Sequence, residues 1–321
     1  MFRKALFATL LMAQALGAAA SDYPSKPIKF IVPYPPGGPT DAMARLIQVP
    51  LQAKLKTPVI IENRGGAGGN IGTDFVAKSP ADGYTMVLAA SGPMAVNSTL
   101  YRSMPFDPLK DLAPVIQISA FPLVLVVHPS VPAKSVKEFV AYAKSKPDGL
   151  SVANAGLGTP THLAAVLFGQ AADVKLVHVP YRGAAPASTD LIAGTTPAMF
   201  NNPVNAVPQV KSGNLRALAV TGANRLAMLP DTPTIAESGY PGFETRTWYG
   251  LFGPAKLPAE IVSKLHADSA KALRIPAVAD NLVAQGWDIT VSPPDRFAVV
   301  LSQEFDRWSA VVKGAGIKAG N

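Results

Sequence analysis

The residues best suited to chemistry in this sequence lie in a loop rich in proline and glycine, from Ile31 to Met43. A β-prone apolar run, residues 28–32, precedes the loop, and a helical pattern begins at Thr40 and Asp41. A strand, a glycine loop and a helix in this order direct unpaired backbone N–H groups and the positive end of a helix dipole at one point. Such a point can bind an anion without any charged side chain. A Gly-Gly turn that only joins two elements is the alternative, and this stretch alone leaves both interpretations open.

Three further loops, each after an apolar β-prone run, carry polar groups suited to the same task. Thr159 and Thr161 could cap a helix or offer hydroxyl groups to a ligand oxygen. Arg182 could pair bidentately with a carboxylate, and Asn201 is the first of two amides at a strand end. Each also has a structural interpretation: helix caps for the threonines and for His162, a surface arginine in a turn, and an Asx-turn at the amides.

Sequence signatures of catalysis and of cofactor binding are missing from this chain. The glycine-rich segment 62–72 lacks the Gly-Lys-Ser/Thr ending of a nucleotide-binding loop and does not fit G-x-G-x-x-G. G-x-S-x-G, S-x-x-K and H-E-x-x-H are absent, and the four histidines do not have the spacing of metal ligands. The absence of cysteine excludes disulfides, thiol catalysis and cysteine-ligated metals. The sequence therefore predicts a site that holds an anion, with no catalytic residue, no cofactor and no metal.

The N-terminus has the composition of a secretory signal peptide. Arg3 and Lys4 form a charged start, residues 5–16 are apolar apart from Gln14, and residues 18–20 are three alanines that suit cleavage. No later stretch reaches the roughly 20 apolar residues that a membrane span requires. We therefore expect residues 1–20 to be a signal peptide and the mature chain to reside in the periplasm.

The charge of the chain is modest once this segment is removed. Loss of Arg3 and Lys4 lowers the formal net charge from +8 to +6. The basic residues are scattered and form no run of the kind that binds nucleic acid. The composition therefore predicts no nucleic-acid partner and a mild preference for anionic ligands.

Apolar β-branched runs alternate with segments of helical period along most of the chain, which indicates an α/β fold with mainly parallel sheets. The expected strands are residues 28–32, 59–62, 84–89, 115–118, 123–128, 150–154, 176–179, 198–200, 215–220 and 287–291. The expected helices are residues 41–55, 70–77, 136–145, 161–169, 185–192, 206–212, 258–273, 277–285 and 295–312. A chain that leaves one α/β unit and returns with a helical tail suggests a two-domain clamp, with crossing segments near Phe121–Val127 and Trp248–Pro254.

The order and spacing of short motifs make the chain resemble the substrate-binding receptors of tripartite tricarboxylate transporters, the Bug family. The resemblance covers essentially the whole mature chain. The motifs that carry it are Tyr23-Pro-Ser-Lys-Pro-Ile28, Pro36-Gly-Gly-Pro-Thr-Asp41, Glu62-Asn-Arg64, Gly66-Ala-Gly-Gly-Asn-Ile-Gly72, Asp82-Gly-Tyr-Thr85, Asp107-Pro-Leu-Lys-Asp111, Gly156-Leu-Gly-Thr159, His162-Leu163, Val179-Pro-Tyr-Arg-Gly183, Leu215-Arg-Ala-Leu-Ala219 and Pro230-Asp-Thr-Pro-Thr234.

The resemblance implies the type II periplasmic-binding-protein fold, with two α/β domains joined by two crossing strands. Domain 1 would comprise residues 21–122 and 247–321, and domain 2 residues 123–246. A ligand carboxylate would lie between the loops Pro36–Asp41 and Gly156–His162, held by backbone amides and ordered waters. Asp41 would fix the helix start rather than touch the anion. The expected ligand-binding residues are Tyr34, Pro36, Gly37, Gly38, Thr40, Asp41, Ser91, Gly92, Gly158, Thr159, Thr161, His162, Tyr181, Arg182 and Asn201.

Two departures from the family pattern bear on the ligand. Many relatives carry Phe-Asp where this chain has Phe200-Asn201, which weakens any preference for a ligand with a cationic amine. Arg64-Gly65-Gly66 replaces the more usual Arg-Pro-Gly and affects loop stiffness. We therefore expect a monomeric receptor that captures a small organic acid and delivers it to the membrane subunits of a tripartite transporter. A receptor that feeds a sensor kinase, and an exported enzyme with His162 and Asp41 as acid–base groups, are the alternatives.

Overall fold

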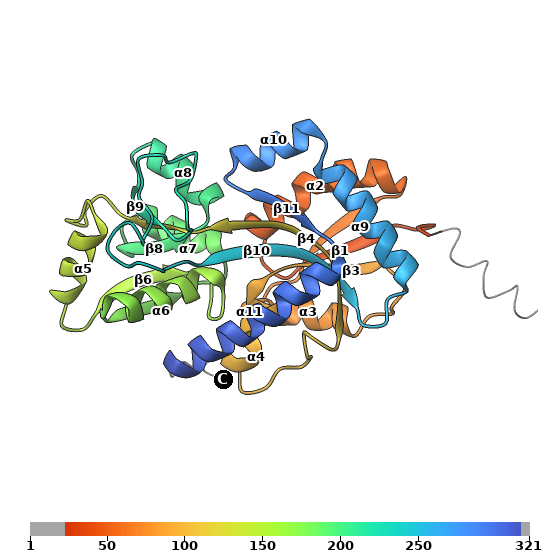
Figure 1. The fold of residues 1–321 in the computed structure, drawn as a ribbon, viewed down its shortest axis with the longest axis horizontal. Helices are drawn as coiled ribbons and strands as arrows, with labels where there is room; N and C mark the ends of the chain where they lie inside the picture. Colours follow the sequence, from red (N-terminus) through yellow and green to blue (C-terminus); the bar gives the residue numbers. More distant parts are fainter. Residues whose placement is uncertain (1–22, 316–321) are drawn as a thin grey trace, which may run out of the picture.

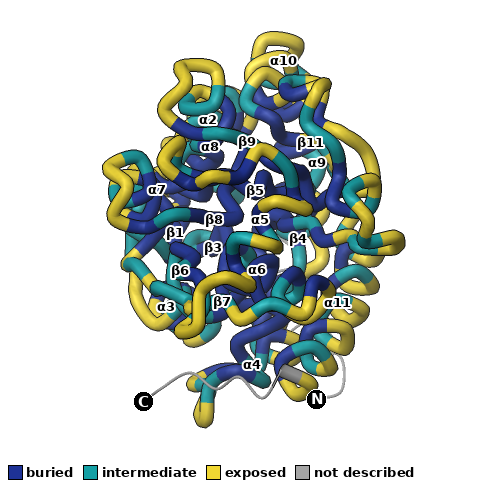
Figure 2. Tube along the Cα trace, turned by 90° about the vertical axis from the view of Figure 1, so that its left-hand side faces the viewer, coloured by how far each residue is buried: buried dark blue, intermediate teal, exposed yellow. Residues whose placement is uncertain are grey.

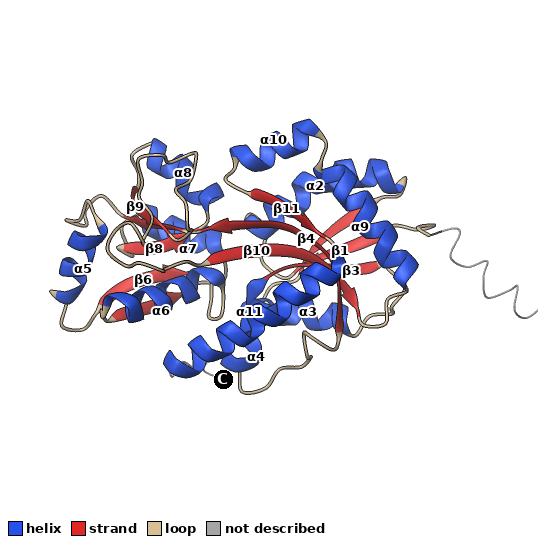
Figure 3. Cartoon of the chain, viewed as in Figure 1, coloured by secondary structure: helices blue, strands red, loops and turns tan. Residues whose placement is uncertain are grey.

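Two β-sheets lie side by side along the long axis of the molecule, each covered by helices (Figures 1 and 3). The computed structural model describes residues 23–315, and the expected signal peptide lies outside them. No helix within this range is long and apolar enough to cross a membrane. Nor do these residues contain a group of His, Asp and Glu side chains that could hold a metal ion.

The larger sheet has six strands in the order β11-β4-β10-β3-β1-β2. With its helices it forms what we call the first lobe, on the right of Figure 1. Strands β1, β2 and β3 are mutually parallel, whereas β10, β4 and β11 pair antiparallel to their neighbours. The strand bounds are β1 Ile28–Val32, β2 Val59–Asn63, β3 Thr85–Ala90, β4 Leu112–Pro122, β10 Arg246–Pro254 and β11 Asp288–Ser292.

The smaller sheet has five strands in the order β7-β6-β8-β5-β9 and forms, with its helices, the second lobe. Its strands are β5 Val124–Val127, β6 Leu150–Asn154, β7 Leu176–Pro180, β8 Ala198–Asn201 and β9 Arg216–Val220. Strand β6 is parallel to β7 and β8, and β5 is antiparallel to β8 and β9. The predicted α/β class is confirmed, but the sheets are mixed: four of the nine strand pairs are parallel and five antiparallel.

Helices cover both faces of both sheets because each lobe has one apolar cluster on either side of its sheet. In the first lobe, α2 (Pro39–Leu55), α9 (Ala259–Leu273) and α10 (Pro276–Ala284) cover one face. The other face is covered by α3 (Asn70–Ala77) and α11 (Pro294–Ala315). The second lobe has α5 (Val136–Lys144) and α6 (Pro160–Ala172) on one face, and α7 (Ala184–Ile192) and α8 (Pro203–Lys211) on the other. The central strands are therefore buried, whereas the edge strands β2, β7 and β11 are partly exposed. The most exposed segments are connecting loops, as the colours of Figure 2 show.

The chain crosses between the lobes twice, once from β4 into β5 and once from the segment after β9 into β10. The first crossing falls inside the predicted segment 121–127. The second lies at Thr245–Arg246 rather than at Trp248–Pro254, because the latter segment is paired with β4 throughout. Thr221 ties the two crossings together: its hydroxyl accepts from the Leu123 N–H (2.8 Å) and donates to the Thr245 carbonyl (2.6 Å).

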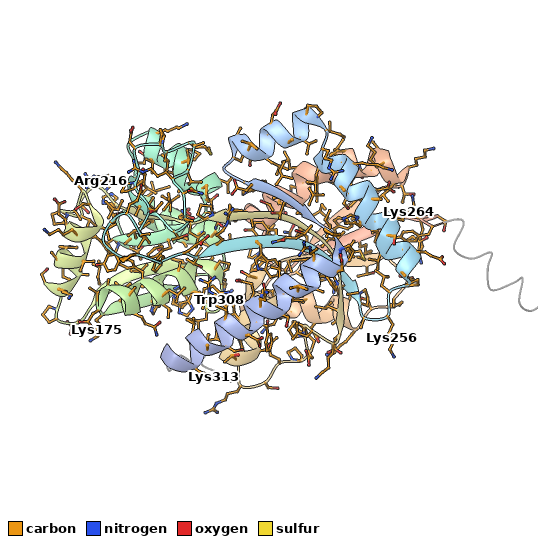
Figure 4. All side chains as sticks on the ribbon, in the orientation of Figure 1. Lys175, Arg216, Lys256, Lys264, Trp308 and Lys313 are labelled. Carbon is orange, nitrogen blue, oxygen red and sulfur yellow. The ribbon has the colours of Figure 1, made fainter. Side chains whose placement is uncertain are left out.

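The strands of the second sheet lie between β4, which ends at Pro122, and β10, which begins at Arg246. The division into domains at residues 122–123 and 246–247 stays a prediction. Whether the two lobes are domains that move relative to each other stays a prediction. In this structure they also meet away from the crossings, in an apolar cluster. The second lobe contributes Leu163 of α6 to it, and the first lobe contributes Val96, Leu100 and, from α11, Trp308. Trp308, labelled in Figure 4, lies where α11 passes the junction of the lobes, whereas the labelled lysines and Arg216 lie farther out.

Candidate ligand-binding site

The N-termini of four helices meet at one small cavity between the lobes. One of the helices, α2, belongs to the first lobe, and α6, α7 and α8 belong to the second. The cavity has a volume of about 40 Å³, room for a few water molecules at roughly 10–15 Å³ each. Its lining consists of Tyr34, Pro35, Pro36, Gly38, Pro39, Thr40, Ala90, Ala155, Thr159, Pro160, Thr161, Gly183, Ala184, Ala185, Pro186, Asn202 and Tyr249.

None of the four helices has its first N–H groups capped by the side chain of its N-cap residue, which is Gly38, Thr159, Gly183 or Asn202. A proline opens α2, α6 and α8, which fixes φ for the helix and removes one N–H that would otherwise need a partner. The remaining free donors are therefore concentrated in the next residues of each helix.

The backbone N–H groups of Thr40, Thr161 and Ala184 donate to no acceptor among residues 23–315. All three residues are buried. A buried N–H without a partner costs about 1–3 kcal/mol, so an acceptor that enters this cavity gains those bonds. Because the donors also lie at the positive ends of helix dipoles, an anion is the acceptor that they favour.

The cavity lining contains no charged side chain. Nine of the seventeen lining residues are proline or alanine, and the polar side chains are those of Thr40, Thr159, Thr161, Asn202 and the two tyrosines. Burial raises the pKa of Tyr34 and of Tyr249, so both phenols stay protonated. The Tyr34 hydroxyl is buried and has no hydrogen-bond partner in the described chain. The two tyrosines come from opposite ends of the sequence, and Tyr249 on β10 pairs directly with Ala90 on β3.

Asp41 lies beside the cavity and holds the first loop in place. Its carboxylate accepts from the Gly37 N–H, the Arg45 Nε–H and the Asn63 amide, each at 3.0 Å. Burial raises the pKa of Asp41, but the hydrogen bonds from Arg45, Gly37 and Asn63 outweigh it and hold the pKa below its usual value. Asn63 also donates to the Tyr34 carbonyl (3.1 Å). Both carboxylate oxygens thus accept hydrogen bonds that shape the loop.

A second, larger cavity of about 610 Å³ adjoins the first and shares Tyr34, Pro35, Pro36, Ala155 and Gly183 with it. The glycine-rich segment 65–69, the loop that contains Tyr181 and Arg182, and the residues Asn63 and Gly156 complete its lining. The Tyr181 hydroxyl donates to Asp190 (2.7 Å), so this group is already partnered. Arg182 is exposed at this outer cavity. We call the first cavity the inner cavity and this one the outer cavity.

Eight of the residues predicted to bind the ligand line these cavities. They are Tyr34, Pro36, Gly38, Thr40, Thr159 and Thr161 at the inner cavity, with Tyr181 and Arg182 at the outer one. Seven do not line either cavity: Gly37, Asp41, Ser91, Gly92, Gly158, His162 and Asn201. Gly37 and Asp41 shape the first loop, and Gly92 and Gly158 lie where the lobes touch. Contact with a ligand stays a prediction for every one of them.

Asn201 and Asn202 have different roles. The Asn201 side chain donates to the Ser188 hydroxyl (3.0 Å) and accepts from the Asn202 N–H (2.8 Å), so it is used inside the second lobe. Asn202, the N-cap of α8, lines the inner cavity instead. From the sequence, both amides were candidates but only Asn201 was named among the ligand-binding residues, and Tyr249 was missed. The adjacent Asn pair was the only signal for Asn202, and nothing local pointed to Tyr249.

Comparisons with known proteins identify the family of the chain. The sequence profile of the tripartite tricarboxylate transporter family receptor matches residues 43–317. Protein BugT of Bordetella pertussis is 39% identical over 305 residues, which are 95% of this chain and 94% of BugT.

Two solved structures are similar over nearly their whole length. The R. palustris protein Rpa4515, solved with adipate, is 37% identical with a TM-score of 0.89 over 92% of this chain and 99% of that one. MatC from Rhodopseudomonas palustris, with bound malate, is 33% identical with a TM-score of 0.86 over 90% of this chain and 100% of that one. These matches confirm the family resemblance and the periplasmic-binding-protein fold, and they set the enzyme alternative aside. The chain belongs to the tripartite tricarboxylate transporter receptor family of solute-binding proteins.

Proposed function

We propose that the chain is a periplasmic receptor that captures a small di- or tricarboxylate, or a related organic acid, in the cleft between its lobes. The observation that carries the proposal is the convergence of four uncapped helix N-termini on one cavity without charged side chains. A carboxylate in the inner cavity would accept from the free N–H groups of Thr40, Thr161 and Ala184, directly or through water.

The two cavities together suggest how such a ligand would lie. The inner cavity has room for one carboxylate and the atoms next to it, and the outer cavity for the rest of the molecule. Arg182 would then face a second anionic group at the outer end. Among residues 23–315, the one carboxylate beside the inner cavity is that of Asp41, and both of its oxygens already accept hydrogen bonds. The site therefore offers no free carboxylate to an ammonium group. Acids without an amine are therefore favoured. The adipate and malate bound by the two relatives fit this description.

Ligand binding in this arrangement is coupled to closure of the lobes. The N-terminus of α2 belongs to the first lobe and that of α6 to the second, so one carboxylate bridges them. An open form would present the same donors too far apart to share one anion, and a ligand therefore shifts the equilibrium toward the closed form by its differential affinity. We propose residues 21–122 with 247–321 and residues 123–246 as the two moving domains, with the crossings near Leu123 and Thr245 as the hinge.

The family supplies the rest of the proposal. A receptor of this kind passes its ligand to membrane subunits of a tripartite transporter, which requires export of the chain, and residues 1–20 are proposed as the signal peptide. The receptor needs no cofactor, and we propose that it acts as a monomer.

Thermal unfolding in the presence of small acids tests the proposal. The protein is first unfolded and refolded to remove any bound ligand, and is then heated with adipate, malate, succinate, citrate or glutamate. Neutral diamides of the same length are the controls. A ligand at 100 times its dissociation constant stabilises the folded state by about 2.7 kcal/mol, which gives a clear upward shift of Tm. A shift with one or more acids and none with the amides supports the proposal. If no acid shifts the Tm of folded protein, the carboxylate assignment is wrong.

A further inference from the structure

The loop Gly156–Thr159 of the second lobe packs closely against the first lobe. A Cβ atom placed on Gly158 would collide with the Asn97 Oδ1 and approach Leu100 to 2.8 Å. The Gly158 carbonyl oxygen lies 3.0 Å from the position that a Cβ of Gly92 would occupy. The Leu157 carbonyl oxygen lies 2.7 Å from the position that a Cβ of Gly68 would occupy. The lobes thus meet backbone to backbone, and a shift of a few tenths of an ångström in this loop would change the contact.

Hydrogen bonds within the second lobe hold this loop in shape. At its base, the Thr161 hydroxyl accepts from the Ala155 N–H (2.9 Å), and Asn154 accepts from the Gly156 N–H (3.0 Å). The Thr159 hydroxyl donates to the Gly156 carbonyl (2.6 Å). At its tip, the Gly158 N–H donates to the Nδ1 atom of His162 (3.2 Å), the one acceptor it has among the described residues.

The His162 side chain accepts this bond and lies outside both ligand cavities. Its side chain is 1% exposed and lines neither the inner nor the outer cavity. The ring of His178, on β7, packs perpendicular to it with the ring centroids 4.7 Å apart, which limits its rotation. Because Nδ1 accepts a hydrogen bond, the proton of the neutral ring is on Nε2. Burial, and then the neighbouring His178, lower the pKa of His162 to about 3, so the acceptor is available at neutral pH.

We propose that His162 is a positioning residue: its neutral imidazole holds Gly158 and thereby gives the loop Gly156–Thr159 the shape in which the lobes close around the ligand. The role of His162 in closure rests on the proposed function, whereas the positioning of the loop by His162 rests on the contacts alone. His162 does not touch the ligand. It acts through Gly158, whose neighbours Asn97 and Gly92 belong to the opposite lobe.

A histidine that only fills space would behave differently from one that acts as an acceptor. Asparagine carries an oxygen, Oδ1, at nearly the same distance from the backbone as the imidazole Nδ1, and can replace it as acceptor for the Gly158 N–H. Leucine is closer to the ring in apolar volume but accepts no hydrogen bond. His162→Asn and His162→Leu therefore separate the two roles.

The Gly158 amide can be observed on its own. Leu–Gly steps occur only at Leu16–Gly17 and Leu157–Gly158 in the 321 residues, so ¹³C-carbonyl leucine with ¹⁵N-glycine gives at most two signals. The signal that is lost in the variant Gly158→Ala is the one that belongs to the Gly158 amide. In the wild-type protein without ligand, we expect this amide to exchange with solvent slowly. In His162→Leu we expect exchange at least tenfold faster, and in His162→Asn within threefold of wild type. Fast exchange in the wild type, or equal rates in both variants, would overturn the proposal without reference to any ligand.

Adipate binding by calorimetry provides the functional half of the test. We expect the affinity for adipate to fall about tenfold or more in His162→Leu and to be largely restored in His162→Asn. Wild-type affinity in His162→Leu, with exchange at Gly158 accelerated, would show that the bond exists but does not matter for closure. If the wild type binds neither adipate nor any acid of the panel while the exchange pattern holds, the proposed function fails and the positioning of the loop by His162 stands.

Discussion

Gly158 of the second lobe and Asn97 of the first lie so close that a β-carbon on Gly158 would overlap the Asn97 side-chain oxygen. Asn97 is fully buried, and its amide donates to Asn70 (2.6 Å) and to the Gly68 carbonyl (3.3 Å). Its position is therefore fixed from within the first lobe. Glycine at the facing positions allows the lobes to approach to this distance. An added methyl group at one of these positions is therefore expected to weaken closure of the lobes more than it lowers the stability of the fold.

Gly92→Ala tests this directly. Its Cβ would stand 3.0 Å from the Gly158 carbonyl oxygen, and Gly92 has no positive φ, so the added methyl strains the closed contact and not the local backbone. We expect the affinity for the best acid of the panel to fall about tenfold, or about 1.4 kcal/mol, with the free energy of unfolding of the ligand-free protein little changed. Gly314→Ala, where an added Cβ meets nothing within 4 Å, is the control for calorimetric titration. Equal affinities of the two variants would contradict the closure argument.

Gly38→Asp and Gly38→Ala separate charge from volume at the first loop. Gly38 is the N-cap of α2 with φ −83°, and an added Cβ would lie 3.7 Å from the nearest atom, the Pro35 carbonyl oxygen. Alanine is therefore tolerated. Aspartate would cap α2 through the N–H groups of Thr40 or Asp41, which favours the helix but takes the donors from the ligand and repels it. We expect Gly38→Asp to lose acid binding by more than a hundredfold, with Tm unchanged or raised. Retained binding in Gly38→Asp would show that the anion binds elsewhere.

Thr221→Val and Thr247→Val make the same change at two buried positions near the crossings. The Thr221 hydroxyl accepts from Leu123 and donates to Thr245, whereas the Thr247 hydroxyl has no partner in the described chain. Removal of the Thr221 hydroxyl leaves a buried N–H and a buried C=O unpaired, at a cost of about 1–3 kcal/mol. We expect Thr247→Val to be neutral or slightly stabilising. Urea unfolding measures both, and similar values for the two variants would rule out the assigned role of Thr221.

His162 predicts how stability responds to acid. Its pKa is about 3 in the folded protein and near 6.5 in the unfolded chain, so the unfolded chain takes up the proton first. The resulting stability is complete above pH 6.5 and is lost as the pH falls toward 3. Between pH 7 and pH 5 the loss amounts to about 2 kcal/mol. The variant His162→Asn has no imidazole at this position and therefore lacks this contribution to the pH dependence. The remaining titratable groups, His178 included, are present in both proteins. Urea unfolding at the two pH values is therefore expected to show a smaller loss in His162→Asn, and equal losses would contradict the assignment.

The sequence located most elements because their signals are local. The run 28–32 and the helix 70–77 were predicted with the bounds that the structure has, since apolar β-branched residues and helix starts identify themselves. Strand direction has no such signal. Buried strands have continuous apolar sequences whether they are parallel or antiparallel. The reversed direction of β5, β10 and β11 therefore could not be seen in the sequence, and the sheets were expected to be mainly parallel.

The candidate site shows the same limit at the scale of one residue. Successive side chains of a strand point to opposite faces, so an uncertainty of one residue in where β8 ends decides whether Asn201 or Asn202 faces the cavity. Tyr249 reaches the cavity from β10, more than two hundred residues after Tyr34, because the chain returns to the first lobe beside β3. Only the folded arrangement places these two tyrosines on one wall.

The inner cavity is lined by peptide dipoles and by side chains without charge, and this has a consequence for the pH range in which the protein works. Fixed dipoles cannot gain or lose protons, and the two phenols of the lining, with their pKa raised by burial, do not titrate near neutrality. A fully ionised acid bound at the inner cavity, as proposed, would then exchange no protons with the medium through these groups. The affinity would depend on pH only through the ionisation of the acid itself. For an acid that is fully ionised at neutral pH, the affinity would therefore be the same at neutral and at mildly alkaline pH.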